Sequence, residues 1–243
     1  MEDRRQSAYI AELVGTFLLV LFIALIVSVY ARNGSPDFAV VGLLHAFVLM
    51  MLIQTLGAVS GAHFNPAVTL ALLCVRKIKP NQAAIYVVMQ VIGAIAGAAL
   101  CRLILDELGQ TPNLGNVAVG PLLAGKTLLG LLAELTGTFV LVWAIMGVAV
   151  NPRGTADWAG FVIGATLGFA VMAFGPLTGA GLNPARALGP AIVAGEFVDG
   201  FGKFLLVYVV GPAIGGVLAA IGYKMLVLDP VGKPGARPVD ELP

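Results

Sequence analysis

The sequence predicts an all-α membrane protein of six transmembrane helices and two half-length helices, arranged as an inverted repeat of three spans. Three observations support this prediction. The chain of 243 residues is 59% hydrophobic and 11% charged, with a mean hydropathy of +0.96, whereas soluble domains carry about a quarter charged residues. Its apolar segments are long enough to cross a hydrocarbon core of ~30 Å. A short motif that ends in Asn-Pro-Ala also occurs twice, at residues 60–67 and 178–185.

Hydropathy indicates six full spans, and their basic flanks predict an orientation. The first apolar run is too long for the core of a signal peptide, so we interpret it as a span. Nine of the 14 Lys and Arg residues fall on one side of this arrangement, which predicts that this side and both termini are cytoplasmic. We expect a multi-pass protein of the cell membrane, with a cytoplasmic tail over 229–243. The predicted spans are 9–30, 38–59, 83–105, 128–149, 158–175 and 203–228.

The two half-length helices are expected at the repeated motifs. Asn is a favoured N-cap and Pro suits the first helical position, so each Asn-Pro-Ala predicts the start of a helix. The first is expected over 65–75, where a basic segment ending in Pro80 stops it. Eleven residues at ~1.5 Å each give ~16 Å, about half of a hydrocarbon core. The second is expected over 183–194, so the two together could cross the bilayer.

Other matching segments extend the repeat over most of the chain. Residues 11–17 match 133–139, and Tyr86-Val87-Val88 matches Tyr208-Val209-Val210. These matches divide the chain into a first half over 1–112, a linker over 113–125 and a second half over 126–228. Each half holds three spans, an odd number, so the second half must be inverted in the membrane. Inverted repeats place their functional site near the midplane, at interrupted helices.

The interrupted backbone predicts the lining of a pore. Irregular backbone at membrane depth occurs where it is buried in protein or lines a water-filled cavity. We expect a ladder of carbonyl acceptors in the lumen, and donors from the amides of Asn65 and Asn183 where the half-helices meet. The positive ends of both helix dipoles point to that position, which disfavours cations and protons. The predicted carbonyls belong to Gly61, Ala62, His63, Gly179, Ala180 and Gly181, with the His63 side chain outside the solute path.

Three charged residues lie in apolar surroundings. Glu12 and Glu134 occupy equivalent positions, and a buried carboxylate is costly unless it is paired. The favoured interpretation is that each holds an interrupted loop through hydrogen bonds; the alternative, a proton relay, requires a chain of further ionisable groups. Arg186 directly follows Asn183-Pro184-Ala185, whereas Val68 follows Asn65-Pro66-Ala67. A fixed cation is therefore expected on the outer loop alone, where it repels cations and offers hydrogen-bond donors.

At these residues the sequence resembles the aquaporin, or major intrinsic protein, family, over about residues 8–228. The resemblance rests on the two Ala-Glu-x-x-Gly-Thr-Phe segments and the two Asn-Pro-Ala motifs. It implies one pore per subunit, a homotetramer, and an outer constriction formed by His45, Val171, Ala180 and Arg186. The pair of His45 and Val171 is similar to plant vacuolar and ammonia-permeable members. Glycerol channels usually carry an aspartate after the arginine, where this chain has Ala187.

These observations predict a passive channel that conducts water and excludes protons and ions, with ammonia and other small neutral solutes as further candidates. A glycerol or small-polyol facilitator is the alternative. An ion-coupled secondary transporter is less favoured because it requires ionisable residues at the midplane. The net charge of +1 gives no sign of a nucleic-acid partner; the expected partners are the solutes and the bilayer. Cys74 and Cys101 lack metal-site spacing, and we predict no metal, cofactor or enzymatic activity.

Overall fold

The computed structural model describes residues 2–30, 37–107 and 114–229, and within them it contains helices and turns but no strands. Six helical segments are long and apolar enough to span a membrane, which confirms the predicted fold class. Most boundaries lie within three residues of the predicted ones, and the largest difference is at the N-terminus, where helix begins at Glu2 rather than residue 9. The predicted tail beyond residue 229 lies outside the described residues. The long helices are α1 (Glu2–Tyr30), α2 (Phe38–Ser60), α4 (Pro80–Glu107), α5 (Thr127–Ile145), α6 (Ala159–Thr178), and α8 with α9 (Phe201–Leu205 and Gly211–Tyr223).

Two of these spans contain π-helical turns, in which hydrogen bonds reach one residue further than in an α-helix. One turn, Met146–Val150, extends α5. A second, Leu206–Val210, joins α8 to α9, and a third, Lys224–Leu228, follows α9. The last span is therefore one continuous helical segment from Phe201 to Leu228.

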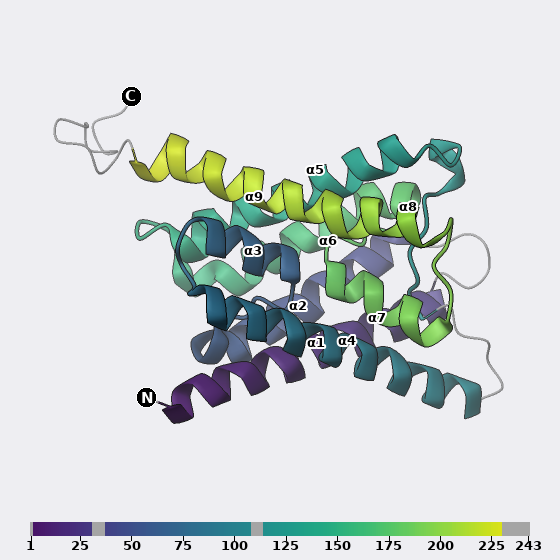
Figure 1. The fold of residues 1–243 in the computed structure, drawn as a ribbon, viewed down its shortest axis with the longest axis horizontal. Helices are drawn as coiled ribbons and strands as arrows, with labels where there is room; N and C mark the ends of the chain where they lie inside the picture. Colours follow the sequence, from purple (N-terminus) through teal and green to yellow (C-terminus); the bar gives the residue numbers. More distant parts are fainter. Residues whose placement is uncertain (1, 31–36, 108–113, 230–243) are drawn as a thin grey trace.

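The short helices α3 (Pro66–Cys74) and α7 (Pro184–Ala194) begin where the two Asn-Pro-Ala motifs predict. In each, the preceding Asn is the N-cap and its side chain accepts a hydrogen bond from the first turn. Figure 1 shows α3 and α7 in the interior, on opposite sides of the centre. The start of α1 and the end of the last helix lie at the same end of the molecule, on the side of α3.

Helix packing follows the repeat. Within the halves, α1 packs against α4, and α5 packs against α9. Between the halves, α2 packs against α6, and each short helix crosses to the other half: α7 contacts α4, and α3 contacts α9. Equivalent glycines allow the close contacts, because a Cβ on Gly93 would meet the carbonyl oxygen of Leu13, and one on Gly215 would meet that of Leu135. The two halves are thus interlocked around α3 and α7.

The connection between the halves also contacts the interior. The amide of Leu114 donates to Ser28 Oγ of α1 at 3.1 Å. The amide of Gly120 donates to the carbonyl of Leu177, at the end of α6, at 2.7 Å. Val117 is fully buried. This segment is therefore held against α1 and α6 on the side where α7 lies.

Candidate functional site

Both loops before the short helices follow the same unusual backbone path. Each begins with a left-handed glycine, Gly61 (φ +85°) or Gly179 (φ +78°), directly after the preceding helix. Two further positions in each loop are left-handed although they are not glycine. They are Ala62 (φ +50°) with Phe64 (φ +46°), and Ala180 (φ +48°) with Leu182 (φ +52°). Such residues cost about 1–3 kcal/mol each, so other contacts must hold both loops in place.

The two predicted glutamates supply those contacts. Both carboxylates are fully buried. Glu12 accepts hydrogen bonds from the backbone amides of His63 (3.0 Å) and Phe64 (2.8 Å) and from the hydroxyl of Ser60 (2.6 Å). Each carboxylate thus satisfies amides that the left-handed backbone turns away from any helix. This geometry favours the loop-holding role over a proton relay.

Glu134 repeats this arrangement in the second half. It accepts from the amides of Gly181 (2.8 Å) and Leu182 (2.6 Å) and from the hydroxyl of Thr178 (2.6 Å). The corresponding bonds in the two halves differ by no more than a few tenths of an ångström. The two loops therefore share one mode of attachment.

Two tyrosines that the sequence analysis did not assign to the site hold the loops from a second side. The hydroxyl of Tyr86 donates to the carbonyl of Ser60 at 2.8 Å, and that of Tyr208 donates to the carbonyl of Thr178 at 2.9 Å. Both rings are buried. Their matching positions in the repeat were a usable signal, because a buried tyrosine hydroxyl normally has a hydrogen-bond partner.

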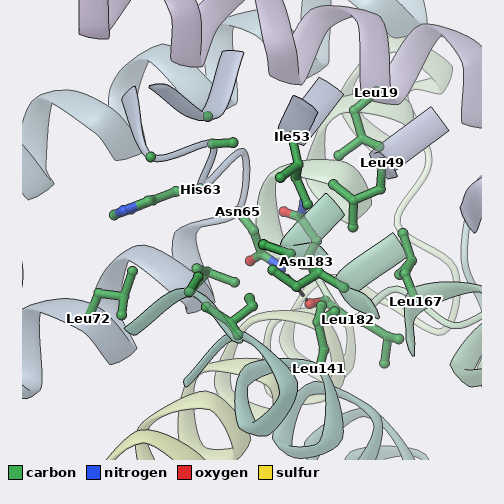
Figure 2. Close-up of a pocket in the computed structure, with 18 of the residues that line it drawn as sticks. Leu19, Leu49, Ile53, His63, Asn65, Leu72, Leu141, Leu167, Leu182 and Asn183 are labelled. Carbon is green, nitrogen blue, oxygen red and sulfur yellow. Dashed lines mark hydrogen bonds between the residues drawn. The ribbon is translucent and has the colours of Figure 1, made fainter. Parts of the chain in front are cut away.

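The side chains of Asn65 and Asn183 join the two loops at the centre. Asn65 Nδ2 donates to the carbonyl of Leu182 at 2.9 Å, and Asn183 Nδ2 donates to the carbonyl of Phe64 at 2.8 Å. Their Oδ1 atoms accept from the amides of Ala67 and Ala185. Each amide has two N–H groups, so one donor on each side chain is left for a solute. Figure 2 shows the two asparagines side by side on the cavity.

The asparagines lie on the wall of a cavity of about 710 Å³. Its wall also includes Gly61, Ala62, His63, Ala180 and Gly181 of the loops, whereas Gly179 is not on it. Most of the remaining wall is apolar, and the leucines and isoleucines come from both halves (Figure 2). The His63 side chain points away from Asn65 (Figure 2), and its Nδ1 lies 3.1 Å from Thr69 Oγ1.

Arg186 lies on the cavity wall and is 3% exposed. Its Nη1 donates to the carbonyl of Gly115, in the connection between the halves, at 2.6 Å. Its Nε is buried without a hydrogen-bond partner in the described structure, and no carboxylate within the described residues forms a salt bridge with it. The guanidinium is therefore a fixed cation with spare donor capacity on the cavity wall.

The structure places three of the four predicted constriction residues on this cavity: His45, Ala180 and Arg186. Nδ1 of His45 lies 2.7 Å from the carbonyl of Val41, so this nitrogen is the donor. The other ring nitrogen, Nε2, is the one that can meet a solute. Val171 is buried and is not on the wall, where α6 instead contributes Leu167, one turn earlier. His45, Ala180 and Arg186 therefore line the cavity, and Val171 does not.

Among the described residues, no group of three or more His, Cys, Asp or Glu side chains could hold a metal ion. Cys101 is buried, and Cys74 is exposed at the end of α3. Neither sulfur lies on the cavity.

Six spans, two half-helices that meet at paired asparagines, and a cavity along that meeting point define a multi-pass membrane channel rather than an enzyme. Residues 3–223 match the sequence model of the major intrinsic protein family. The chain belongs to this family, whose members are channels.

Individual relatives agree with this assignment. The chain is 36% identical to aquaporin NIP1-1 of rice (Oryza sativa subsp. japonica), over 89% of this chain and 73% of that protein. It is 37% identical to glycerol uptake facilitator protein-like 6 of Lactiplantibacillus plantarum, over 90% of this chain and 97% of that protein. It is 34% identical to aquaporin AqpM of Methanothermobacter marburgensis, again over 90% of this chain and 97% of that protein. The aquaglyceroporin from Plasmodium falciparum has the same fold, with a TM-score of 0.77 at 22% identity, over 93% of this chain and 98% of that one.

Proposed function

We propose that this protein is a passive water channel that excludes protons and ions and also conducts small neutral solutes such as ammonia. The observation that carries the proposal is the pair of asparagines on the cavity wall, each with one N–H already bonded to the opposite loop. The other N–H of each can donate to a passing oxygen. A water molecule that donates onward to loop carbonyls has partners throughout, so it needs no coupled ion.

Exclusion of ions follows from the charges around this point. The N-termini of α3 and α7 each carry about half a positive charge. Arg186 adds a full charge, and the described residues place no salt bridge on it. A cation or an excess proton is repelled at both positions, whereas a neutral solute is not.

Glycerol facilitation is the second candidate, and a specific observation favours it. Ten leucine and isoleucine side chains line the cavity, and they can contact the carbon backbone of a polyol while the loops meet its hydroxyls. One relative named above is called a glycerol uptake facilitator protein. Ala187, fully buried after Arg186, marks a departure from the aspartate expected in glycerol channels.

The deciding experiment measures water, glycerol, urea and ammonia fluxes in proteoliposomes by stopped-flow light scattering and internal pH. We expect water flow above the lipid background, with an activation energy of roughly 5 kcal/mol or less because loop groups replace lost hydrogen bonds. Proton flux should stay at the level of empty vesicles. A proton current that follows the water flow would contradict the mechanism.

Ammonia is tested in the same vesicles by internal alkalinisation under an inward ammonium gradient. Val171 is smaller than histidine, so Val171→His should reduce ammonia flux while water flow persists. Because Val171 is buried and is not among the residues that line the cavity, this variant also tests whether the position faces the solute path. Equal ammonia fluxes in both proteins would remove Val171 from the constriction.

The remaining expectations concern assembly and placement. We propose that four copies form a homotetramer in the cell membrane, each with its own pore, and that both termini face the cytoplasm. In Figure 1 the start of α1 and the end of the last helix lie at the same end of the molecule, which supports placing both termini on one side of the membrane. Cross-linking in native membranes tests the tetramer, and protease access to terminal tags in intact cells tests the orientation.

A further inference from the structure

The internal repeat relates each end of the cavity to the other. The loops align at a spacing of 118 residues, which pairs Ser60 with Thr178 and Asn65 with Asn183. The same spacing holds within α2 and α6, because it pairs Ala46 with Gly164, and these two residues contact each other: a Cβ on Gly164 would lie 2.5 Å from the carbonyl oxygen of Ala46. A contact between two equivalent residues lies on the pseudo-twofold axis, so the spacing can be applied along both helices.

Applied to the four outer constriction positions, this spacing gives four inner ones. His45, Val171, Ala180 and Arg186 correspond to Ile163, Ile53, Ala62 and Val68. All four of the inner residues lie on the cavity wall, and Figure 2 shows Ile53 directed into the cavity. The symmetry of the repeat thus predicts a second set of four side chains on the cavity wall, and the described residues include all four.

The two sets lie at different depths and differ in chemistry. On α2, Ile53 follows His45 by eight residues, which at ~1.5 Å per residue is ~12 Å along the helix. The outer set contains a guanidinium and an imidazole. The inner set contains only alkyl side chains, with Val68 in the place of Arg186 and Ile163 in the place of His45. A solute that leaves the asparagines on the inner side thus meets no polar side chain from this set.

We propose that Ile53, Ala62, Val68 and Ile163 form an inner specificity ring. The ring selects by withholding hydrogen bonds, whereas the outer set selects by charge. A solute within it must give up hydrogen bonds to water that alkyl groups cannot replace, and apolar constrictions of this kind oppose hydrated species. The cost rises with the number of polar groups, so the ring should slow a polyol with three hydroxyls more than water.

This inference rests on the proposed function, and a matched set of substitutions separates the two. Val68→Thr adds one hydroxyl to the ring at nearly constant size. Ile163→Thr does the same from α6, and it remains informative if the hydroxyl introduced by Val68→Thr bonds to the backbone of its own helix. Val150→Thr is the control, because Val150 lies on the same cavity wall but outside the ring.

The measurement is the ratio of glycerol to water permeability in proteoliposomes that contain equal amounts of each protein. We expect the ratio to rise about two- to fivefold in Val68→Thr and Ile163→Thr, the effect of about one net hydrogen bond, and to stay at the parental value in Val150→Thr. If the parent conducts water but the ratio is unchanged in both ring variants, or rises equally in the control, the proposal of an inner specificity ring is wrong. A parent that conducts neither solute would overturn the proposed function itself.

Discussion

The two interrupted loops have the same backbone but different surroundings. In both, a glutamate binds two loop amides and a hydroxyl, and a tyrosine binds the carbonyl at the end of the preceding helix. Behind the first loop, Gln90 Nε2 also donates to Glu12 (2.7 Å) and to Thr69 Oγ1 (3.0 Å). The equivalent positions in the second half are Pro212 and Ala187, which have no polar side chain.

The difference shows which contacts the architecture requires and which belong to one face of the channel. The second loop keeps its left-handed path without an equivalent of the Gln90 network, so the architecture does not require that network. The first loop has Val68 toward the cavity and polar groups behind it. The second has Arg186 toward the cavity and apolar groups behind it. The two loops therefore share one backbone path, but they differ in the polarity of the side chains that face the cavity and of those that pack behind the loop.

The largest effect is expected from cysteines placed on the two equivalent loop alanines. Ala180→Cys and Ala62→Cys each put a thiol on the cavity wall, whereas neither native sulfur lies there. A membrane-impermeant organomercurial added outside whole cells should abolish nearly all water flow through Ala180→Cys. It should leave Ala62→Cys and the parent unaffected, because in the proposed orientation the reagent is too large to pass the proposed constriction at Arg186.

Cell swelling after reagent treatment provides the readout, and a reducing thiol should restore the flow. Block of Ala62→Cys from outside would contradict the proposed orientation. Block of the parent would show that Cys74 or Cys101 is reachable by a route that the structure does not indicate.

A second test compares the two glutamates by neutralising each in turn. In Glu134→Gln, the new amide must face either the Leu182 or the Gly181 amide, and two donors then oppose each other in a buried site. In Glu12→Gln the same conflict arises, but Gln90 can rotate its amide and accept a hydrogen bond with Oε1, which has no partner in the parent. An unsatisfied buried group costs about 1–3 kcal/mol, so Glu134→Gln should be destabilised more, by about that amount.

Thermal unfolding in detergent measures this difference, with Glu107→Gln at the exposed end of α4 as a control that should match the parent. Equal losses in the two core variants would mean that Gln90 does not adapt. A greater loss in Glu12→Gln would reverse the comparison.

Much of this arrangement could be predicted from the sequence because it depends on patterns of neighbouring residues. Hydropathy predicts the spans, and Asn-Pro predicts where α3 and α7 begin. The role of the glutamates followed from the cost of a buried charge. The contacts of Gln90 and the Gly115 carbonyl could not be predicted, because partners distant in sequence are chosen by packing. Val171 shows the same limit, since counting along α6 gives its position but not whether its side chain lines the cavity.

The third test removes the charge that distinguishes the second loop from the first. Arg186→Val gives the second loop the residue that the first loop has at the equivalent position, Val68. We expect retained water flow and a rise of about tenfold in cation and proton leak, which corresponds to about 1.4 kcal/mol of lost repulsion. Arg153→Val, at an exposed position between α5 and α6, is the control and should not leak. An unchanged leak in Arg186→Val would assign Arg186 to holding Gly115 rather than to exclusion.

The smallest effect is expected from Gln90→Leu, which gives the first loop the apolar backing of the second. The substitution removes two hydrogen bonds, to Glu12 and Thr69, each worth about 0.5–1.5 kcal/mol net. It also removes Oε1, a buried oxygen without a partner, whose desolvation cost offsets part of that loss. The net destabilisation should be about 1 kcal/mol, read as a small decrease in the unfolding temperature with water flow near the parental value. Because Glu12 keeps both loop amides and the Ser60 hydroxyl, the first loop should then behave as the second does. A loss as large as that of Glu134→Gln would show that the shared contacts cannot hold the first loop alone.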